Sequence, residues 1–209
     1  MAKLRFYHSV MNSGKSLRLL ATAHDFDEKG IEILVLKPST DTRDGKDTIK
    51  SRAGLKRKCI SIDSTVNIFK AVNDTNHVKM AMHEKTIQWI LVDECQFLTE
   101  EQVEQLSDIV DFLNIEVICY GLRTDFKSKL FPGSKRLFEL ADEIKEIKTL
   151  CHCGEKASIN ARFNQDGHII TEGNQILVGG EDLYRPVCRR EWKELIRQQL
   201  KSDKNAENT

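Results

Sequence analysis

The fold is decided by residues 4–16, LRFYHSVMNSGKS, in which a short apolar strand pattern leads into Ser9-Val10-Met11-Asn12-Ser13-Gly14-Lys15-Ser16 and then into a helix. A loop between a strand and a helix N-terminus presents backbone amides to a phosphate chain, and the helix dipole favours the anion. Lys15 then reaches the β- and γ-phosphate oxygens, and the Ser16 hydroxyl can bind magnesium. We therefore predict a phosphate loop, although Ser9 stands where such loops usually have a glycine. The plain alternative is a chance Ser-Gly-Lys-Ser turn at a helix start.

A second part of the site follows the apolar run at residues 87–92, which leads directly into Asp93-Glu94-Cys95-Gln96. In open α/β sheets, ligands bind at the carboxyl ends of the strands. Asp93 is placed to hold magnesium through water, and Glu94 to accept the proton of an attacking hydroxyl group. With the phosphate loop, these four residues form the predicted site for ATP and Mg²⁺. The plain alternative is that both carboxylates only end the strand and hydrate the loop.

Strand-like apolar runs at residues 4–7, 31–36, 87–92 and 115–120 alternate with helical patterns. Such strands have no solvent-facing side, which is typical of a sheet covered by helices on both faces. Residues 99–113 are the firmest helix, because Thr99 and Gln102 are spaced as a capping box ahead of an apolar period of three and four. We predict an α/β fold with a mostly parallel sheet. The polar residues 39–58 indicate a mobile functional loop rather than a core element.

The six cysteines fall into two groups. Three are isolated, whereas Cys151, Cys153 and Cys188 share one stretch of short strands and glycine turns. In a reducing compartment such a cluster favours a structural Zn²⁺ over disulfides. We predict a phosphate-loop domain over residues 1–149, a zinc-bearing subdomain over 150–192, and a C-terminal helix with a disordered tail over 193–209.

The overall composition excludes several classes of partner. Of 209 residues, 32 are Lys or Arg and 32 are Asp or Glu, so the net charge is zero. No bulk attraction to nucleic acid or to an anionic membrane follows from that balance. The amino-terminal residues carry no apolar run long enough for a signal peptide or a membrane span. We expect a cytoplasmic protein with small-molecule substrates.

Taken together, the motifs resemble those of the thymidine kinases of the human-cytosolic and bacterial type, over about residues 3–192. The matching blocks are residues 11–16, 41–43, 93–98 and 120–126, and Gly179-Gly180 followed by Tyr184 and Cys188-Arg189. Their order and spacing are highly specific. The resemblance implies a RecA-like phosphate-loop domain with a small zinc-ribbon-like lasso subdomain. It also implies ATP-dependent phosphorylation of the 5′-hydroxyl of thymidine and of deoxyuridine, feedback inhibition by dTTP, and a homotetramer.

The resemblance also assigns residues to roles. Glu94 would be the proton acceptor, with Lys15 and Arg43 stabilising phosphate charge. A lasso over residues 164–184 would hold the thymine base, whose edge main-chain groups read, so that cytidine binds poorly. The residues implied at the nucleoside are Met11, Asp41, Arg43, Phe97, Leu122, Phe126, Phe131, Gln175, Ile176, Leu177, Val178, Gly179 and Tyr184. For each apolar one, the plain alternative is an ordinary core side chain.

The fourth zinc ligand departs from the family pattern. The family usually has Cys or His three residues after the third cysteine, and this chain has Glu191 there. Glu191 could bind through oxygen, His152 could take its place, or the site could be incomplete. The predicted ligand set is Cys151, Cys153, Cys188 and Glu191.

Two other classes of function compete with a nucleoside kinase. A nucleic-acid-dependent ATPase has an acidic box similar to residues 93–96 and is often accompanied by a zinc ribbon, but such motors need two large lobes and a basic track. A non-catalytic nucleotide-binding regulator would not need Glu94 for turnover.

Overall fold

Six parallel strands form the central sheet of the computed structural model, which describes residues 1–41, 45–175 and 183–207. In order across the sheet they are β5 (Ile60–Ile62), β2 (Ile33–Pro38), β6 (Trp89–Val92), β7 (Glu116–Leu122), β1 (Leu4–Ser9) and β8 (Glu143–Glu146). The prediction of a mostly parallel sheet is confirmed. The four predicted strands correspond to β1, β2, β6 and β7, with bounds that differ by at most two residues.

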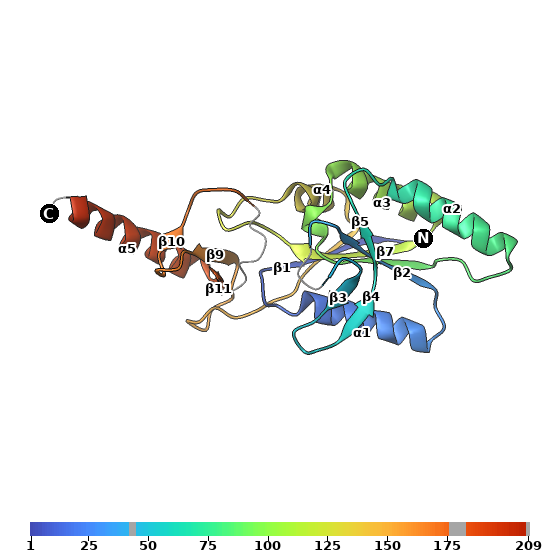
Figure 1. Cartoon of the computed structure of the whole chain (residues 1–209), viewed down its shortest axis with the longest axis horizontal. Helices are drawn as coiled ribbons and strands as arrows, with labels where there is room; N and C mark the ends of the chain where they lie inside the picture. Colours follow the sequence, from blue (N-terminus) through green and yellow to red (C-terminus); the bar gives the residue numbers. More distant parts are fainter. Residues whose placement is uncertain (42–44, 176–182, 208–209) are drawn as a thin grey trace.

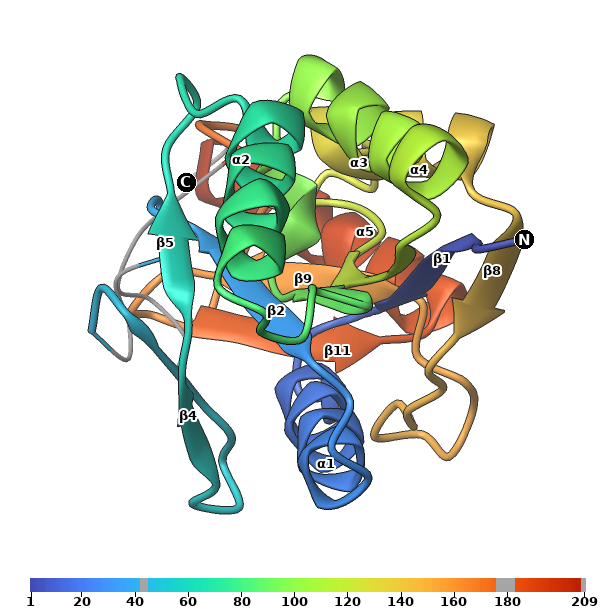
Figure 2. The same ribbon diagram turned by 90° about the vertical axis from the view of Figure 1, so that its right-hand side faces the viewer.

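Helices cover both faces of this sheet, as Figure 2 shows. One face carries α1 (Lys15–Glu28), and the other carries α2 (Ile68–Ala81), α3 (Glu100–Leu113) and α4 (Pro132–Leu140). The capping box of α3 is confirmed, because the Thr99 side chain accepts a hydrogen bond from the Gln102 backbone and the Gln102 side chain accepts one from the Thr99 backbone. No helix in the described parts of the chain is long and apolar enough to span a membrane.

The segment at residues 39–58 differs from the loose loop that its composition predicts. Within it, β3 (Thr48–Lys50) and β4 (Lys56–Lys58) form an antiparallel hairpin, and Ile49 is buried in the core on the α1 side of the sheet. The side chain of Lys37, only 1% exposed, lies 3.7 Å from the Asp41 carboxylate. It also donates hydrogen bonds to the backbone carbonyls of Gly45 and Thr48. These contacts tie the described part of the segment to β2.

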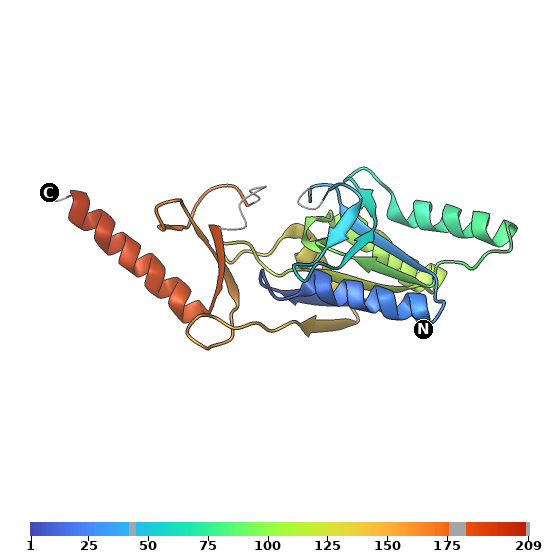
Figure 3. The ribbon, with the colours of Figure 1, turned by 60° about the horizontal axis from the view of Figure 1, so that its bottom comes forward.

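A small lobe lies beyond the phosphate-loop end of the sheet (Figure 1). It contains β9 (Ile159–Phe163), β10 (Ile169–Ile170) and β11 (Tyr184–Val187) in the order β10-β9-β11, with α5 (Arg189–Glu207) packed on them. Figures 1 and 3 show α5 extending away from the main sheet. This helix continues to Glu207, past Leu200, where the sequence predicts a disordered tail.

One buried side chain joins the small lobe to the phosphate loop. Asn160 of β9, 2% exposed, accepts a hydrogen bond from the Met11 backbone amide (2.7 Å) through its side-chain oxygen. Its side-chain nitrogen donates to the Thr124 carbonyl, which follows β7 (3.2 Å). A single amide therefore fixes the small lobe against two segments of the larger domain.

Candidate active site

The phosphate loop leaves β1 at Ser9 and enters α1 at Lys15. Asn12 (φ 60°) and Gly14 (φ 81°) take left-handed backbone conformations that turn the chain into the helix. Ser9 pairs with Leu122 as an ordinary strand residue, so the missing glycine creates no backbone strain there. The Lys15 ammonium group donates to the Val10 carbonyl (3.1 Å), which holds the cation at the centre of the loop.

The acidic strand end lies beside this loop. The Ser16 hydroxyl donates to Asp93 Oδ2 (2.8 Å), and the Glu94 backbone amide donates to Asp93 Oδ1 (3.1 Å). Burial, followed by the neighbouring charge of Glu94, raises the pKa of Asp93 to about 7. Glu94 itself has a left-handed backbone (φ 49°, ψ 37°), which is strained for a residue with a side chain and is typical of functional sites.

The raised pKa of Asp93 predicts a gain in stability for the Asp93→Asn variant. The folded chain keeps the Asp93 proton at pH values where the unfolded chain loses it, so the contribution of Asp93 to the free energy of unfolding falls as pH rises from 3.8 to about 7. Asparagine does not titrate. Its side-chain oxygen can accept from the Glu94 backbone amide, and its NH₂ group can donate to the Ser16 hydroxyl, which reverses the direction of that hydrogen bond. Without divalent cations, we expect a Tm several degrees above wild type at about pH 8, with a smaller gap at about pH 5. Thermal unfolding followed by circular dichroism measures the Tm of both proteins at each pH. A Tm of Asp93→Asn below that of wild type at about pH 8 would contradict the prediction.

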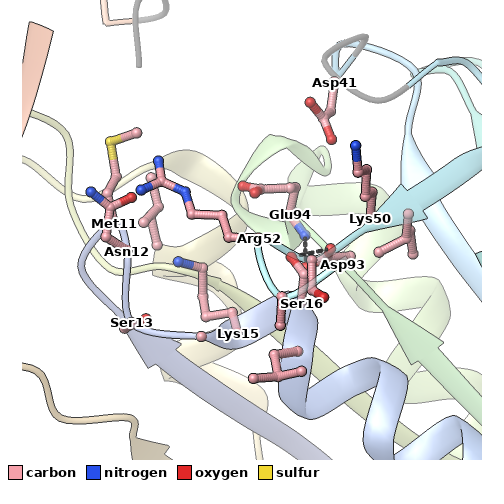
Figure 4. A pocket seen from close by; sticks show the side chains of 16 residues that line it. Met11, Asn12, Ser13, Lys15, Ser16, Asp41, Lys50, Arg52, Asp93 and Glu94 are labelled. Carbon is pink, nitrogen blue, oxygen red and sulfur yellow. Dashed lines mark hydrogen bonds between the residues drawn. The ribbon is translucent and has the colours of Figure 1, made fainter. Parts of the chain in front are cut away.

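Both parts of the site open into one cavity of about 780 Å³ (Figure 4). Four of the residues that line it are Lys15 and Ser16 from the start of α1, and Asp93 and Glu94, which follow the end of β6. The predicted residues in the lining are Met11, Asn12, Ser13, Gly14, Lys15, Ser16, Asp41, Asp93, Glu94 and Leu122. The cavity therefore brings a cationic phosphate loop and a carboxylate pair together.

The cavity also contains residues that the sequence reasoning missed. Lys50 lines it from the end of β3, and Ser51, Arg52 and Ala53 line it from the turn that follows. Figure 4 shows Lys50 and Arg52 beside the carboxylate pair. The Ser51 backbone shapes this turn, donating to Leu55 and accepting from Gly54. The sequence signal for these residues is a pair of cations, Lys50 and Arg52, just before Ala53-Gly54. These cations indicate a site only when the β3–β4 hairpin places them there, and the polar composition of residues 39–58 predicts a loop instead of a hairpin.

Other predicted residues lie outside the cavity lining. Cys95 and Gln96 are buried beneath it, and Phe97 packs edge-on against Phe131 with ring centroids 5.8 Å apart. The Arg162 guanidinium lies over the rings of Phe126 (5.0 Å) and Tyr184 (5.9 Å).

The predicted lasso is described only in part. The Gln175 side chain donates to the Asp125 carboxylate (3.0 Å). The remaining predicted residues, Arg43, Ile176, Leu177, Val178 and Gly179, lie outside the described residues.

The small lobe contains a cluster that could hold a metal ion. The ligand atoms of Cys151, Cys153, Cys188 and Glu191 all lie within 4.8 Å of one another. The sulfur atoms of Cys153 and Cys188 are 3.7 Å apart, close to the value of about 3.8 Å that a tetrahedral site with Zn–S bonds of about 2.3 Å requires. Cys151 Sγ lies 2.6 Å from Glu191 Oε2. His152 is exposed and does not belong to this group, whose three thiolates and one carboxylate are donors that zinc accepts.

The parallel sheet, the phosphate loop and the acidic strand end define an α/β phosphate-loop protein of the nucleotide-binding class. A family model described as thymidine kinase matches residues 2–192. The chain belongs to the thymidine kinase family. It is 47% identical over 197 residues to the thymidine kinase of Enterobacteria phage T4, covering 94% of this chain and 98% of the phage protein. The thymidine kinase of Vibrio cholerae is 45% identical (94% and 99% covered), and that of Rhodopirellula baltica 42% (97% and 93% covered).

Proposed function

We propose that this chain transfers the γ-phosphoryl group of ATP to the 5′-hydroxyl of thymidine, giving dTMP and ADP in the salvage of pyrimidine deoxynucleosides. One observation carries the proposal: Lys15, at the start of α1, and Glu94, just after β6, line the same cavity. Lys15 can then stabilise the transferred phosphate in the same cavity in which Glu94 can accept the proton of the attacking hydroxyl group. Membership of the thymidine kinase family supplies the nucleoside.

In the proposed reaction, the 5′-oxygen of thymidine forms a bond to the γ-phosphorus as the bond from that phosphorus to the bridging β,γ-oxygen breaks. The hydroxyl proton passes to the Glu94 carboxylate, and ADP leaves with the electron pair of the broken bond. Lys15 and the amides of the phosphate loop stabilise the charge on the transferring group. Arg43 is proposed to assist in stabilising this charge.

Ser16 and Asp93 are proposed to hold Mg²⁺. Their side-chain oxygens are 2.8 Å apart at the edge of the cavity, and hard oxygen donors of this kind suit that ion. When bound, Mg²⁺ neutralises charge on the β- and γ-phosphate oxygens.

The nucleoside is proposed to lie between the cavity and the small lobe. Met11 and Leu122 line the cavity on this side, and Phe126 and Tyr184 flank the Arg162 guanidinium. Phe97 and Phe131 would enclose the sugar, and residues 175–179 of the lasso (164–184) would read the base through their main chain. We further propose inhibition by dTTP, a homotetramer, a cytoplasmic location, and separate domains at residues 1–149 and 150–192.

A comparison of acceptors tests the proposed function. We expect ADP formation with Mg²⁺ and thymidine or deoxyuridine, and little with deoxycytidine or deoxyadenosine. ADP formation stimulated only by single-stranded DNA would indicate a motor ATPase instead. Binding of ATP without turnover on any acceptor would indicate a regulator.

Arg52 is proposed as a further cation for the transferring phosphate, besides Lys15 and Arg43, because its side chain enters the cavity that Lys15 lines (Figure 4). We expect Arg52→Met to lower kcat by about 100-fold, as the loss of one preorganised charge does in comparable sites. Lys56→Met is the matched control, because Lys56 is an exposed cation of the same hairpin and does not line the cavity. Steady-state kinetics of both variants decide the role, and equal effects would refute it.

Zinc is proposed to order the small lobe rather than to take part in the chemistry. Chelation should therefore lower the Tm and raise the KM for thymidine by about tenfold, while the Kd for ATP changes little. Glu191→Ala should weaken zinc binding by about 10- to 100-fold in a competition titration with a chelator. Glu194→Ala is the control, because Glu194 is an exposed acid one turn further along α5. Protein purified without any bound zinc would end this proposal.

A further inference from the structure

Gln96 is buried, and both the oxygen and the nitrogen of its side-chain amide make hydrogen bonds. It lies in a short 3-10 helix, η1 (Cys95–Phe97), and is 1% exposed. Its side-chain oxygen accepts from the Leu122 backbone amide (2.9 Å), and its side-chain nitrogen donates to Glu94 Oε2 (2.5 Å). A backbone N–H can only donate, so Leu122 must face the amide oxygen and Glu94 must face the NH₂ group. The backbone of β7 therefore sets the orientation of this amide.

The surrounding backbone leaves this side chain little room to move. A Cβ atom on Gly121 would lie 2.7 Å from Gln96 Oε1 and 2.5 Å from Cys95 Sγ. A Cβ atom on Gly133, at the start of α4, would lie 2.7 Å from the Cys95 carbonyl oxygen. Thus η1, the end of β7 and the start of α4 meet at backbone contact distance, where packed interiors do not relax freely.

We propose that Gln96 is a positioning residue, whose amide holds the Glu94 carboxylate and the end of β7 at Leu122 in one fixed relation. The proposal rests on the proposed function, in which Glu94 takes the proton of the nucleoside hydroxyl. The Glu94 carboxylate and Leu122 both line the cavity, and Gln96 does not. Gln96 thus acts through the base and the acceptor side of the cavity, and not on the nucleotide.

The Gln96→Met variant removes both hydrogen bonds with a small change of shape. A misplaced base slows the chemical step more than it weakens binding. We expect kcat to fall by about 30- to 100-fold, while the Kd for ATP changes by less than about twofold.

Kinetics in a Glu94→Gln background separate this role from a general loss of structure. If Gln96 works through Glu94, adding Gln96→Met to Glu94→Gln should lower kcat by no more than about threefold further. Effects that multiply in the double variant would overturn the proposal, and so would a normal kcat in the Gln96→Met variant.

Gln105 offers a matched control for folding. It is a buried glutamine of α3 whose side-chain oxygen accepts from the Ile68 backbone amide (2.7 Å), and it does not line the cavity. Gln105→Met should lower the Tm and leave kcat unchanged. If Gln96→Met does not fold, Gln96→Glu keeps an acceptor for Leu122 but sets a second carboxyl group against Glu94. A normal kcat in Gln96→Glu would then refute the role, whereas a wild-type chain inactive on thymidine would refute the proposed function itself.

Discussion

Glu94→Gln is expected to lower kcat for thymidine by about 1,000-fold, within the range that a general base contributes. Glutamine has nearly the shape of glutamate and can still accept the hydrogen bond from Gln96, but it cannot take a proton. The phosphate loop is unchanged, so ATP should bind with a Kd within about twofold of wild type. A coupled assay of ADP release gives kcat, and calorimetric titration gives the Kd.

A near-normal kcat in Glu94→Gln would remove Glu94 from the role of base. Loss of ATP binding together with kcat would instead assign Glu94 to the nucleotide. Asp93 is the neighbouring acid, and its hydrogen bonds to the Ser16 hydroxyl and the Glu94 backbone amide keep it on the magnesium side of the proposed site.

Lys15→Met should have an effect of similar size for a different reason. Lys15 is 7% exposed as a residue, and its ammonium group, bonded to the Val10 carbonyl, is proposed to face the β- and γ-phosphates. Its loss should lower kcat/KM for ATP by about 1,000-fold, since both nucleotide binding and charge stabilisation suffer. Lys29→Met provides the control, because Lys29 is an exposed lysine that follows the other end of α1. A Lys15→Met variant with ordinary kcat/KM for ATP would show that the loop binds something else.

The parallel sheet and the phosphate-loop side of the site were predictable because local patterns determine them. Buried parallel strands appear as continuous apolar runs, and β1, β2, β6 and β7 all have this signature. The edge strands β5 and β8 were missed, because Ile-Ser-Ile and Glu-Ile-Lys-Glu are short and partly polar, as edges exposed to solvent allow.

The remaining features depend on contacts between distant residues. Lys37 fixes residues 45–48 by hydrogen bonds to the carbonyls of Gly45 and Thr48, which no local pattern in the sequence predicts. Arg52 reaches the cavity only because Ile49 anchors the hairpin in the core. Gln96 appears in sequence as one more residue of the acidic motif, and only its two partners show that it is buried beneath the cavity.

The side chain of Asn160 limits how this chain can be recombined with its relatives. A chimera that receives a foreign segment for residues 150–192 brings its own residue to this position. That residue must offer an acceptor to the Met11 amide and a donor to the Thr124 carbonyl. If it does not, the Met11 amide of the phosphate loop loses its buried hydrogen-bond partner. Exchange of the small lobe would then disturb the phosphate loop and the ATP binding proposed for it, so altered acceptor preference should be engineered by point changes within the lobe rather than by grafting.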